Sequence, residues 1–263
     1  MAIKFRSLCS GSGGNAALLR TAGAGVLIDF APGCQRDCRA MLRELKQTSG
    51  DLSSVLVTHA HGDHINRNSL KVLKEEGMTV RCHPRVRRQI KDRHGAKYAD
   101  IIHPLEDRTA IGDLTVSLIE VPHSPRCYTT AFILTTESEG RRYKAAVFTD
   151  FNDFADEHVT LAADSDLLCL EANHDLELLE NCGHPGSEFH MSNLRTAEFL
   201  YGICGRSRSQ PKAVVLGHLS EDCNKPHLPV KEIESYFRKY DLPVNFKTHV
   251  SPRSTPGELL TIK

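Results

Sequence analysis

The stretch THAHGDH, residues 58–64, places three histidines and an aspartate within six residues, directly after the apolar run VLV. In an extended chain alternate side chains face the same side, so His59 and His61 can bind one ion together. Asp63 and His64 follow a glycine, where the backbone can turn, and can face a second ion. Imidazole suits zinc, iron or nickel, and a carboxylate adds affinity for harder ions such as manganese. The stretch therefore predicts a metal site.

The chain has the size of one globular domain, and we predict a single domain that spans residues 1–263. The formal net charge is zero and the pI is about 7.2, so any site for a polyanion must be local. No apolar run reaches the length of a membrane span. The nine cysteines are scattered without a CxxC pair, which indicates reduced thiols in a cytoplasmic protein.

Short apolar strands alternate with amphipathic helices in both halves of the sequence. This pattern predicts two sheets packed together with helices outside. We expect helices over residues 35–46, 85–93, 192–201 and 230–240, and strands over residues 114–121, 129–136, 143–149, 167–170, 213–216 and 244–247.

Three further candidate ligands, His123, Asp150 and His218, each follow the end of an apolar strand. Strand ends that meet at one sheet edge bring together residues that are distant in the sequence. A consistent assignment puts three histidines on one metal ion, an aspartate with two histidines on the other, and Asp150 between them. The two sets are His59, His61 and His123, and Asp63, His64 and His218.

With these residues the chain resembles the metallo-β-lactamase superfamily, whose HxHxDH motif matches residues 59–64 and whose later ligand motifs match in order. The resemblance implies an αββα sandwich with a dinuclear metal site at one sheet edge. It also implies that Asp29 organises a loop rather than binding metal. A glycine common two positions later in the superfamily is Ala31 here.

Within the superfamily the chain is most similar to the YycJ/WalJ type. Four segments carry this resemblance in order: SLCSGSGGN at residues 7–15, EANHD at 171–175, HMSN at 190–193 and HLSE at 218–221. The resemblance implies a 5′-to-3′ DNA exonuclease that uses a hydroxide bridging two divalent metal ions. The chain departs from the type at Ser124-Pro125 and at residues 181–186.

Other residues are candidates for roles in turnover. Asp63 can orient a hydroxide as well as bind metal, and His190 and His174 are candidates for protonating the leaving oxygen, because histidine titrates near neutral pH. The loop over residues 10–15 offers amides and hydroxyls for a phosphate oxygen, although a tight structural turn explains it equally well. The candidate substrate contacts are Ser10, Ser12, Asn15 and Asn173.

A basic segment precedes the strand-rich middle of the chain and carries Arg81, Arg85, Arg87, Arg88, Lys91 and Arg93. It is either a solvated helix face or an edge that binds a polyanion such as DNA.

The leading hypothesis is a metal-dependent phosphodiesterase that acts on DNA. The alternatives are a phosphodiesterase for small cyclic ribose phosphates, a thioester or lactam hydrolase, and a non-catalytic metal-binding regulatory protein. All seven ligand positions are filled, which argues against the last. The mixture of imidazole and carboxylate leaves zinc and manganese both open.

Overall fold

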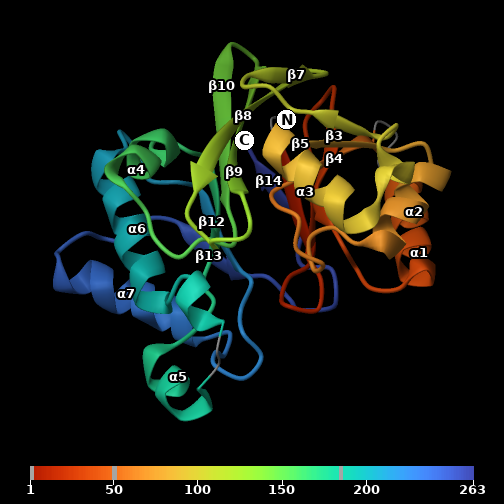
Figure 1. Ribbon diagram of the computed structural model, residues 1–263. Coiled ribbons are helices and arrows are strands. Elements are labelled where there is room, and N and C mark those ends of the chain that lie inside the picture. The colour runs from red at the N-terminus through yellow and green to blue at the C-terminus, as the bar shows by residue number, and fades with distance from the viewer. Residues whose placement is uncertain (1–2, 49–51, 184–185) are drawn as a thin grey trace.

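The computed structural model describes residues 3–48, 52–183 and 186–263. In this part of the chain two mixed sheets of seven strands each lie face to face (Figure 1). The first sheet has the order β14-β1-β2-β3-β4-β5-β6, and the second has the order β13-β12-β11-β10-β9-β8-β7. The strands of the first sheet are β1 (Ile3–Cys9), β2 (Ala16–Arg20), β3 (Gly25–Phe30), β4 (Leu52–Val57), β5 (Thr79–Cys82), β6 (Ile102–Pro104) and β14 (Leu260–Ile262). Those of the second are β7 (Thr109–Ile111), β8 (Leu114–Val121), β9 (Thr129–Ser138), β10 (Arg141–Phe148), β11 (Leu167–Glu171), β12 (Ala213–Gly217) and β13 (Lys247–Val250).

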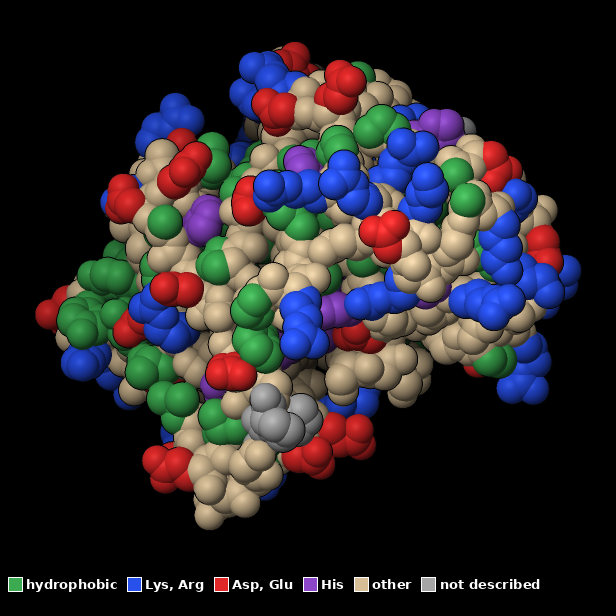
Figure 2. Space-filling model, viewed as in Figure 1, with side chains coloured by type: hydrophobic (Ala, Val, Ile, Leu, Met, Phe, Trp, Pro, Cys, Tyr) green, Lys and Arg blue, Asp and Glu red, His purple; other side chains and the backbone are tan. Residues whose placement is uncertain are grey.

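Helices cover the outer face of each sheet, with α1, α2 and α3 on one side and α4, α6 and α7 on the other (Figure 1). Charged side chains are spread over the outer surface in this view, and hydrophobic ones gather mainly at the left, near α7 (Figure 2). The helices are α1 (Gln35–Thr48), α2 (Arg67–Glu75), α3 (Pro84–His94), α4 (Asp156–Ala162), α5 (Leu176–Cys182), α6 (Asn193–Arg206) and α7 (Leu228–Lys239), with short 3₁₀ turns at Ala96–Tyr98 and Ser187–Phe189. This arrangement is the predicted αββα sandwich.

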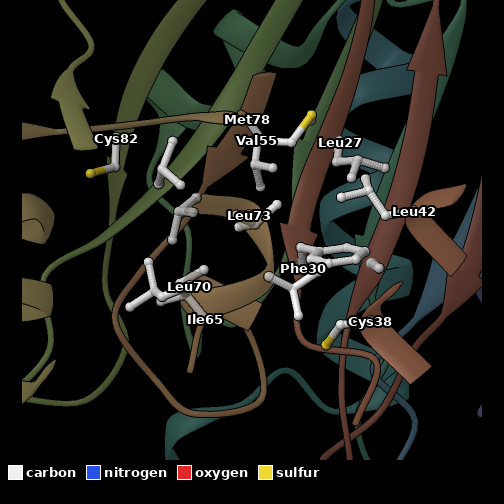
Figure 3. Close-up of a cluster of buried hydrophobic side chains, with 14 of the residues drawn as sticks. Leu27, Phe30, Cys38, Leu42, Val55, Ile65, Leu70, Leu73, Met78 and Cys82 are labelled. Carbon is white, nitrogen blue, oxygen red and sulfur yellow. The ribbon is translucent and has the colours of Figure 1, made fainter. Parts of the chain in front are cut away.

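Three hydrophobic clusters hold the four layers together. One cluster joins the two sheets and includes Ile28 and Leu56 from the first and Phe132 and Val215 from the second. Another packs the first sheet against α1 and α2, with Leu42 among the helical members (Figure 3). The third packs the second sheet against α4, α6 and α7. Burial of apolar area in these layers is the main stabilising contribution.

The strand directions place several carboxyl ends at one edge of the sandwich. In the first sheet β3, β4 and β5 run parallel, and in the second β10, β11 and β12 run parallel. Strand β8 has the direction of β10, because both pair antiparallel with β9. The loops that leave these carboxyl ends therefore collect at one edge.

The expected elements are confirmed with small shifts in their bounds. The final strand was expected over residues 244–247 and lies at Lys247–Val250, because Val244 is exposed and belongs to the loop before it. Strands β6, β7 and β14 have three residues each, which is too short for a periodic pattern.

The expectation that all cysteines are reduced is wrong. Cys182 at the end of α5 forms a disulfide with Cys223, and the other seven cysteines are free. The two partners are 41 residues apart, and their Cα atoms are 6.2 Å apart. Without a CxxC spacing, only the fold reveals this pair. Within the described ranges, no helix combines the length and the apolar character needed to cross a membrane.

Candidate metal centre

The loop that follows β4 presents its histidines at the shared edge. The ring centroids of His59 and His61 are 4.6 Å apart, and His123, which follows β8, lies 5.2 Å from His59. The Nε2 atom of His123 is 3.3 Å from Nδ1 of His61. The three imidazoles expected on one ion therefore lie side by side, although among the described residues the compact group of potential ligand atoms joins His59 and His61 with Cys127 rather than with His123.

The second expected set also converges. Oδ2 of Asp63 lies 3.4 Å from Nε2 of His64 and 3.3 Å from Nε2 of His218. Asp150 lies against two members of this second set: its Oδ2 is 2.9 Å from Nε2 of His64, and its Oδ1 is 3.4 Å from Nδ1 of His218. His59, His64 and Asp150 also form one compact group of potential ligand atoms. Asp150 thus lies against members of both expected sets, His59 of the first and His64 of the second.

A buried aspartate braces the first loop. Asp29, near the end of β3, accepts hydrogen bonds from the amide and hydroxyl of Thr58 at 2.9 and 3.1 Å. Its Oδ2 is 2.7 Å from Nδ1 of His64, so the other ring nitrogen of His64 faces Asp150. A carboxylate behind a ligating histidine fixes the orientation and tautomer of the ring. Asp29 therefore organises the loop, as the sequence resemblance implied.

A second buried carboxylate, Glu171 at the end of β11, has the same role for the opposite side and was not predicted. Its Oε1 lies 2.6 Å from Nδ1 of His190 and 2.9 Å from Nδ1 of His218. Its Oε2 accepts the amides of Phe151 and Met191 at 3.0 and 3.3 Å. The signal in the sequence was a lone acidic residue directly after the apolar run LLCL, the same placement that identified Asp150.

Three of the four expected substrate contacts, Ser10, Asn15 and Asn173, form hydrogen bonds within the protein next to candidate ligands. The hydroxyl of Ser10 accepts the amide of His218 at 2.8 Å, and a Cβ at Gly217 would crowd this hydroxyl. Asn15 donates through Nδ2 to the carbonyl of Gly11 at 3.1 Å. It lies equally close to Nε2 of His64. The loop over residues 10–15 thus uses much of its polar capacity inside the protein, and Ser12 is exposed.

Asn173 supports a candidate ligand in the same way: its Nδ2 donates to the carbonyl of His218 at 2.9 Å. The superfamily glycine replaced by Ala31 does not disturb the turn, because the Ala31 amide donates to the Asn15 carbonyl at 3.0 Å. At this turn Gly14 is the residue whose backbone packs closely against residue 31, since a Cβ at position 14 would lie 2.1 Å from the Ala31 carbonyl oxygen.

The departure from the YycJ/WalJ type at residues 181–186 includes His184 and Pro185, which lie outside the described residues.

Three site residues have left-handed backbone conformations, with φ of 54° at Asp29, 55° at Asp150 and 56° at His218. Such conformations are uncommon for residues other than glycine and concentrate at functional sites, where the surrounding structure holds them in place. Each lies at or near the end of a strand. The strained turns direct these side chains toward the shared edge.

The site favours positive charge. Burial acts to lower the pKa of His218, but Asp150, Asp63 and Glu171 outweigh it and raise this pKa to about 10. His64 has a raised pKa for the same reason, with Asp150 and Asp29 the main contributors after burial. Burial would raise the pKa of Asp150, yet the histidines around it hold that pKa well below its usual value.

The residues present fit divalent metal ions. Nε2 of His59 is buried and, among the described residues, has no hydrogen-bond partner. Burial lowers the pKa of His59 well below its usual value, so the ring is neutral and its free nitrogen is a potential metal ligand. Imidazole and carboxylate donors together suit zinc or manganese. Cys127, whose sulfur lies close to His59 and His61, completes a further potential ligand group that the sequence did not suggest.

The two candidates for proton transfer are placed differently. His190 forms one group of potential ligand atoms with Asp150, Glu171 and His218. Its Nδ1 lies 3.5 Å from Oδ1 of Asp150, and 19 % of its side chain is exposed. Burial acts to lower the pKa of His190, but the negative charge of Glu171 outweighs burial, so this pKa is raised. His174 belongs to none of the potential ligand groups found among the described residues, and its buried Nδ1 has no hydrogen-bond partner among them.

Comparison with known proteins identifies the class. A family model described as "Beta-lactamase superfamily domain" matches residues 25–218, so the chain belongs to the β-lactamase superfamily. The matched residues run from the start of β3 to His218 and so include all seven candidate metal ligands.

Individual relatives show which members of the superfamily the chain is similar to. The chain is 24 % identical to exodeoxyribonuclease WalJ of Streptococcus pneumoniae serotype 2 (strain D39 / NCTC 7466), with 98 % of each chain covered. It is 26 % identical to exodeoxyribonuclease YycJ of Bacillus anthracis, over 87 % of this chain and 86 % of that protein. The crystal structure of the metallo-β-lactamase fold protein YhfI from Bacillus subtilis superposes with a TM-score of 0.69 at 15 % identity, covering 98 % of this chain and 99 % of that one. The chain is therefore a hydrolase of the metallo-β-lactamase fold, a class that implies divalent metal ions.

Proposed function

We propose that this protein is a 5′-to-3′ DNA exonuclease that works with two divalent metal ions, zinc or manganese, held in a single catalytic domain spanning residues 1–263. The observation that carries the proposal is that the seven candidate residues lie together at one edge, with Asp150 against His59 of one set and against His64 and His218 of the other. The relatives named exodeoxyribonuclease support DNA as the substrate.

Seven residues would hold the ions. His59, His61 and His123 would bind one ion, and Asp63, His64 and His218 would bind the other. Asp150 would bind both ions. When bound, such ions lower the pKa of water and neutralise charge that develops on a phosphoryl oxygen.

The protein's own residues orient the reacting groups. Asp29 and Glu171 hold the rings of His64 and His218 through Nδ1, so that Nε2 of each faces the site. Asp63 lies partly exposed at the site, with 22 % of its side chain accessible, and orients the attacking water. His190, held by Glu171 at Nδ1, protonates the leaving oxygen.

Metal analysis combined with degradation of end-labelled DNA tests the proposal. We expect divalent metal in the purified protein and activity that EDTA abolishes. DNA labelled at the 5′ end should release its label as a mononucleotide at once, whereas DNA labelled at the 3′ end should shorten gradually. Hydrolysis of a small chromogenic phosphodiester without any action on single- or double-stranded DNA would contradict the exonuclease and favour a small-molecule phosphodiesterase.

His190→Ala tests the proton-transfer role. We expect turnover to fall about 10²- to 10⁴-fold while the metal content stays the same. His174→Ala is the matched control, since this histidine lies outside the potential ligand groups of the described chain. Loss of metal together with activity in His190→Ala would instead assign His190 to metal binding.

A further inference from the structure

A groove leads away from His123 across the surface between α3 and the β8–β9 connection. It encloses about 570 Å³, within the range of roughly 300–1,000 Å³ typical of ligand sites. Its walls include Arg85 and Arg88 from α3 and Arg126 and Tyr128 from the connection. Because His123 belongs to the candidate metal centre, one end of the groove opens at the reacting groups.

The three arginines of the groove are free to bind an anion. Arg85, Arg88 and Arg126 are all exposed, and in the described ranges none of them forms an ion pair. Other basic residues of the same helix are engaged. Arg87 donates to the carbonyl of Ile102 at 2.9 Å, and Arg93 donates to the carbonyl of Ala60.

Aromatic contacts fix the position of one of these arginines. The guanidinium of Arg85 lies 4.9 Å from the centroid of the Tyr128 ring, and His83 stacks on the same ring with centroids 4.4 Å apart. The Tyr128 hydroxyl donates to Glu120 at 2.9 Å, so the single carboxylate of the groove wall is already hydrogen-bonded. Planar rings and guanidinium groups at one place suit unpaired bases and phosphates together.

A side-chain clamp joins the two walls. Gln89 of α3 donates to the carbonyl of Arg126 at 3.1 Å and accepts the amide of Tyr128 at 3.2 Å. The backbone of Arg126 is therefore held against α3, the helix that carries Arg85 and Arg88. In Figure 2, Lys and Arg side chains gather over α3, the same region of the surface.

We propose that this groove binds the single DNA strand next to the scissile phosphodiester, with Arg85, Arg88 and Arg126 on successive phosphates. This inference rests on the proposed nuclease function and names the path of its substrate. The small volume of the groove suits nucleotides of one strand rather than a duplex.

Binding without cleavage tests the groove. Fluorescence anisotropy with a labelled single-stranded DNA oligonucleotide in EDTA measures affinity separately from hydrolysis. We expect Arg88→Ala and Arg126→Ala each to weaken binding about fivefold at 0.1 M salt. Each should also lower the slope of log affinity against log salt by about 0.7. Arg88→Lys should retain most of the affinity, because the charge remains.

Arg43→Ala is the matched control, since Arg43 is an exposed helical arginine on α1, outside the groove. Arg43→Ala should bind the oligonucleotide with the unsubstituted affinity and salt dependence, because Arg43 does not line the groove. Two results would contradict the proposal that the groove binds DNA. One is equal DNA affinity of Arg43→Ala and the Arg88→Ala/Arg126→Ala double variant, and the other is no DNA binding by the unsubstituted protein. A protein that binds DNA through the groove yet never degrades it would instead overturn the nuclease function.

Discussion

The candidate metal centre has two halves that are built in different ways. The contiguous half, His59, His61, Asp63 and His64, comes from one loop after β4. The dispersed half, His123, Asp150 and His218, takes one residue from each of three strand ends. Each half has a buried carboxylate behind one of its histidines, Asp29 behind His64 in the contiguous half and Glu171 behind His218 in the dispersed half.

The two bracing carboxylates differ in how much of the chain depends on them. Asp29 contacts Thr58 and His64, which belong to one loop. Glu171 contacts Phe151, His190, Met191 and His218, which belong to three separate segments. A contiguous set of ligands needs little support, because the covalent chain already keeps its members together. A dispersed set depends on the contacts that join its strands.

Asp150→Asn should have the largest effect, because Asp150 contacts both halves. Asparagine tolerates the left-handed backbone of this position, so the fold should remain intact. We expect turnover of a chromogenic phosphodiester to fall about 10³-fold with a reduced metal content. Steady-state kinetics and elemental analysis measure both. Full metal content with normal turnover would show that the two halves work without a shared carboxylate.

Removal of the Cys182–Cys223 disulfide tests whether the dispersed half needs covalent support. Cys223 follows His218 in the chain, and its carbonyl accepts the amide of Asp175. Closing a loop of 41 residues contributes about 4 kcal/mol to stability. Cys182→Ser should lose about this amount in urea unfolding, and a reductant should have the same effect on the unsubstituted protein only. Alkylation of all nine cysteines under non-reducing, denaturing conditions would show that the bond does not form.

Glu171→Gln and Asp29→Asn compare the two braces directly. Loss of a carboxylate behind a ligating histidine typically lowers metal affinity about 10- to 100-fold. We expect Glu171→Gln near the upper end of this range and Asp29→Asn near the lower, because Glu171 joins more segments. Competition with a chromophoric chelator gives both affinities. Equal losses would show that the origin of the ligands in one loop or in several makes no difference.

The sequence predicted the contiguous half almost completely, because its members lie within six residues and share a strand end. It also placed His123, Asp150 and His218 at strand ends, and the sandwich followed from alternating strands and helices. The sequence did not predict the role of Glu171, because the partners of a buried acidic residue are known only once the order of the strands in the sheet is known. The bracing roles of Ser10 and Asn173 were missed for the same reason, since Ser10 is 208 residues from His218.

Ser10→Ala should have the smallest effect and tests the contact between the halves. Ser10 follows β1 in the first sheet, and its hydroxyl accepts the amide of His218 in the second. Loss of one such hydrogen bond costs about 1 kcal/mol, which a shifted urea midpoint would reveal. Ser12→Ala is the control, because Ser12 is exposed on the same loop and its change should be within about 0.5 kcal/mol. If the loop binds substrate phosphate instead of joining the sheets, Ser12→Ala should raise KM for DNA and Ser10→Ala should leave the midpoint unchanged.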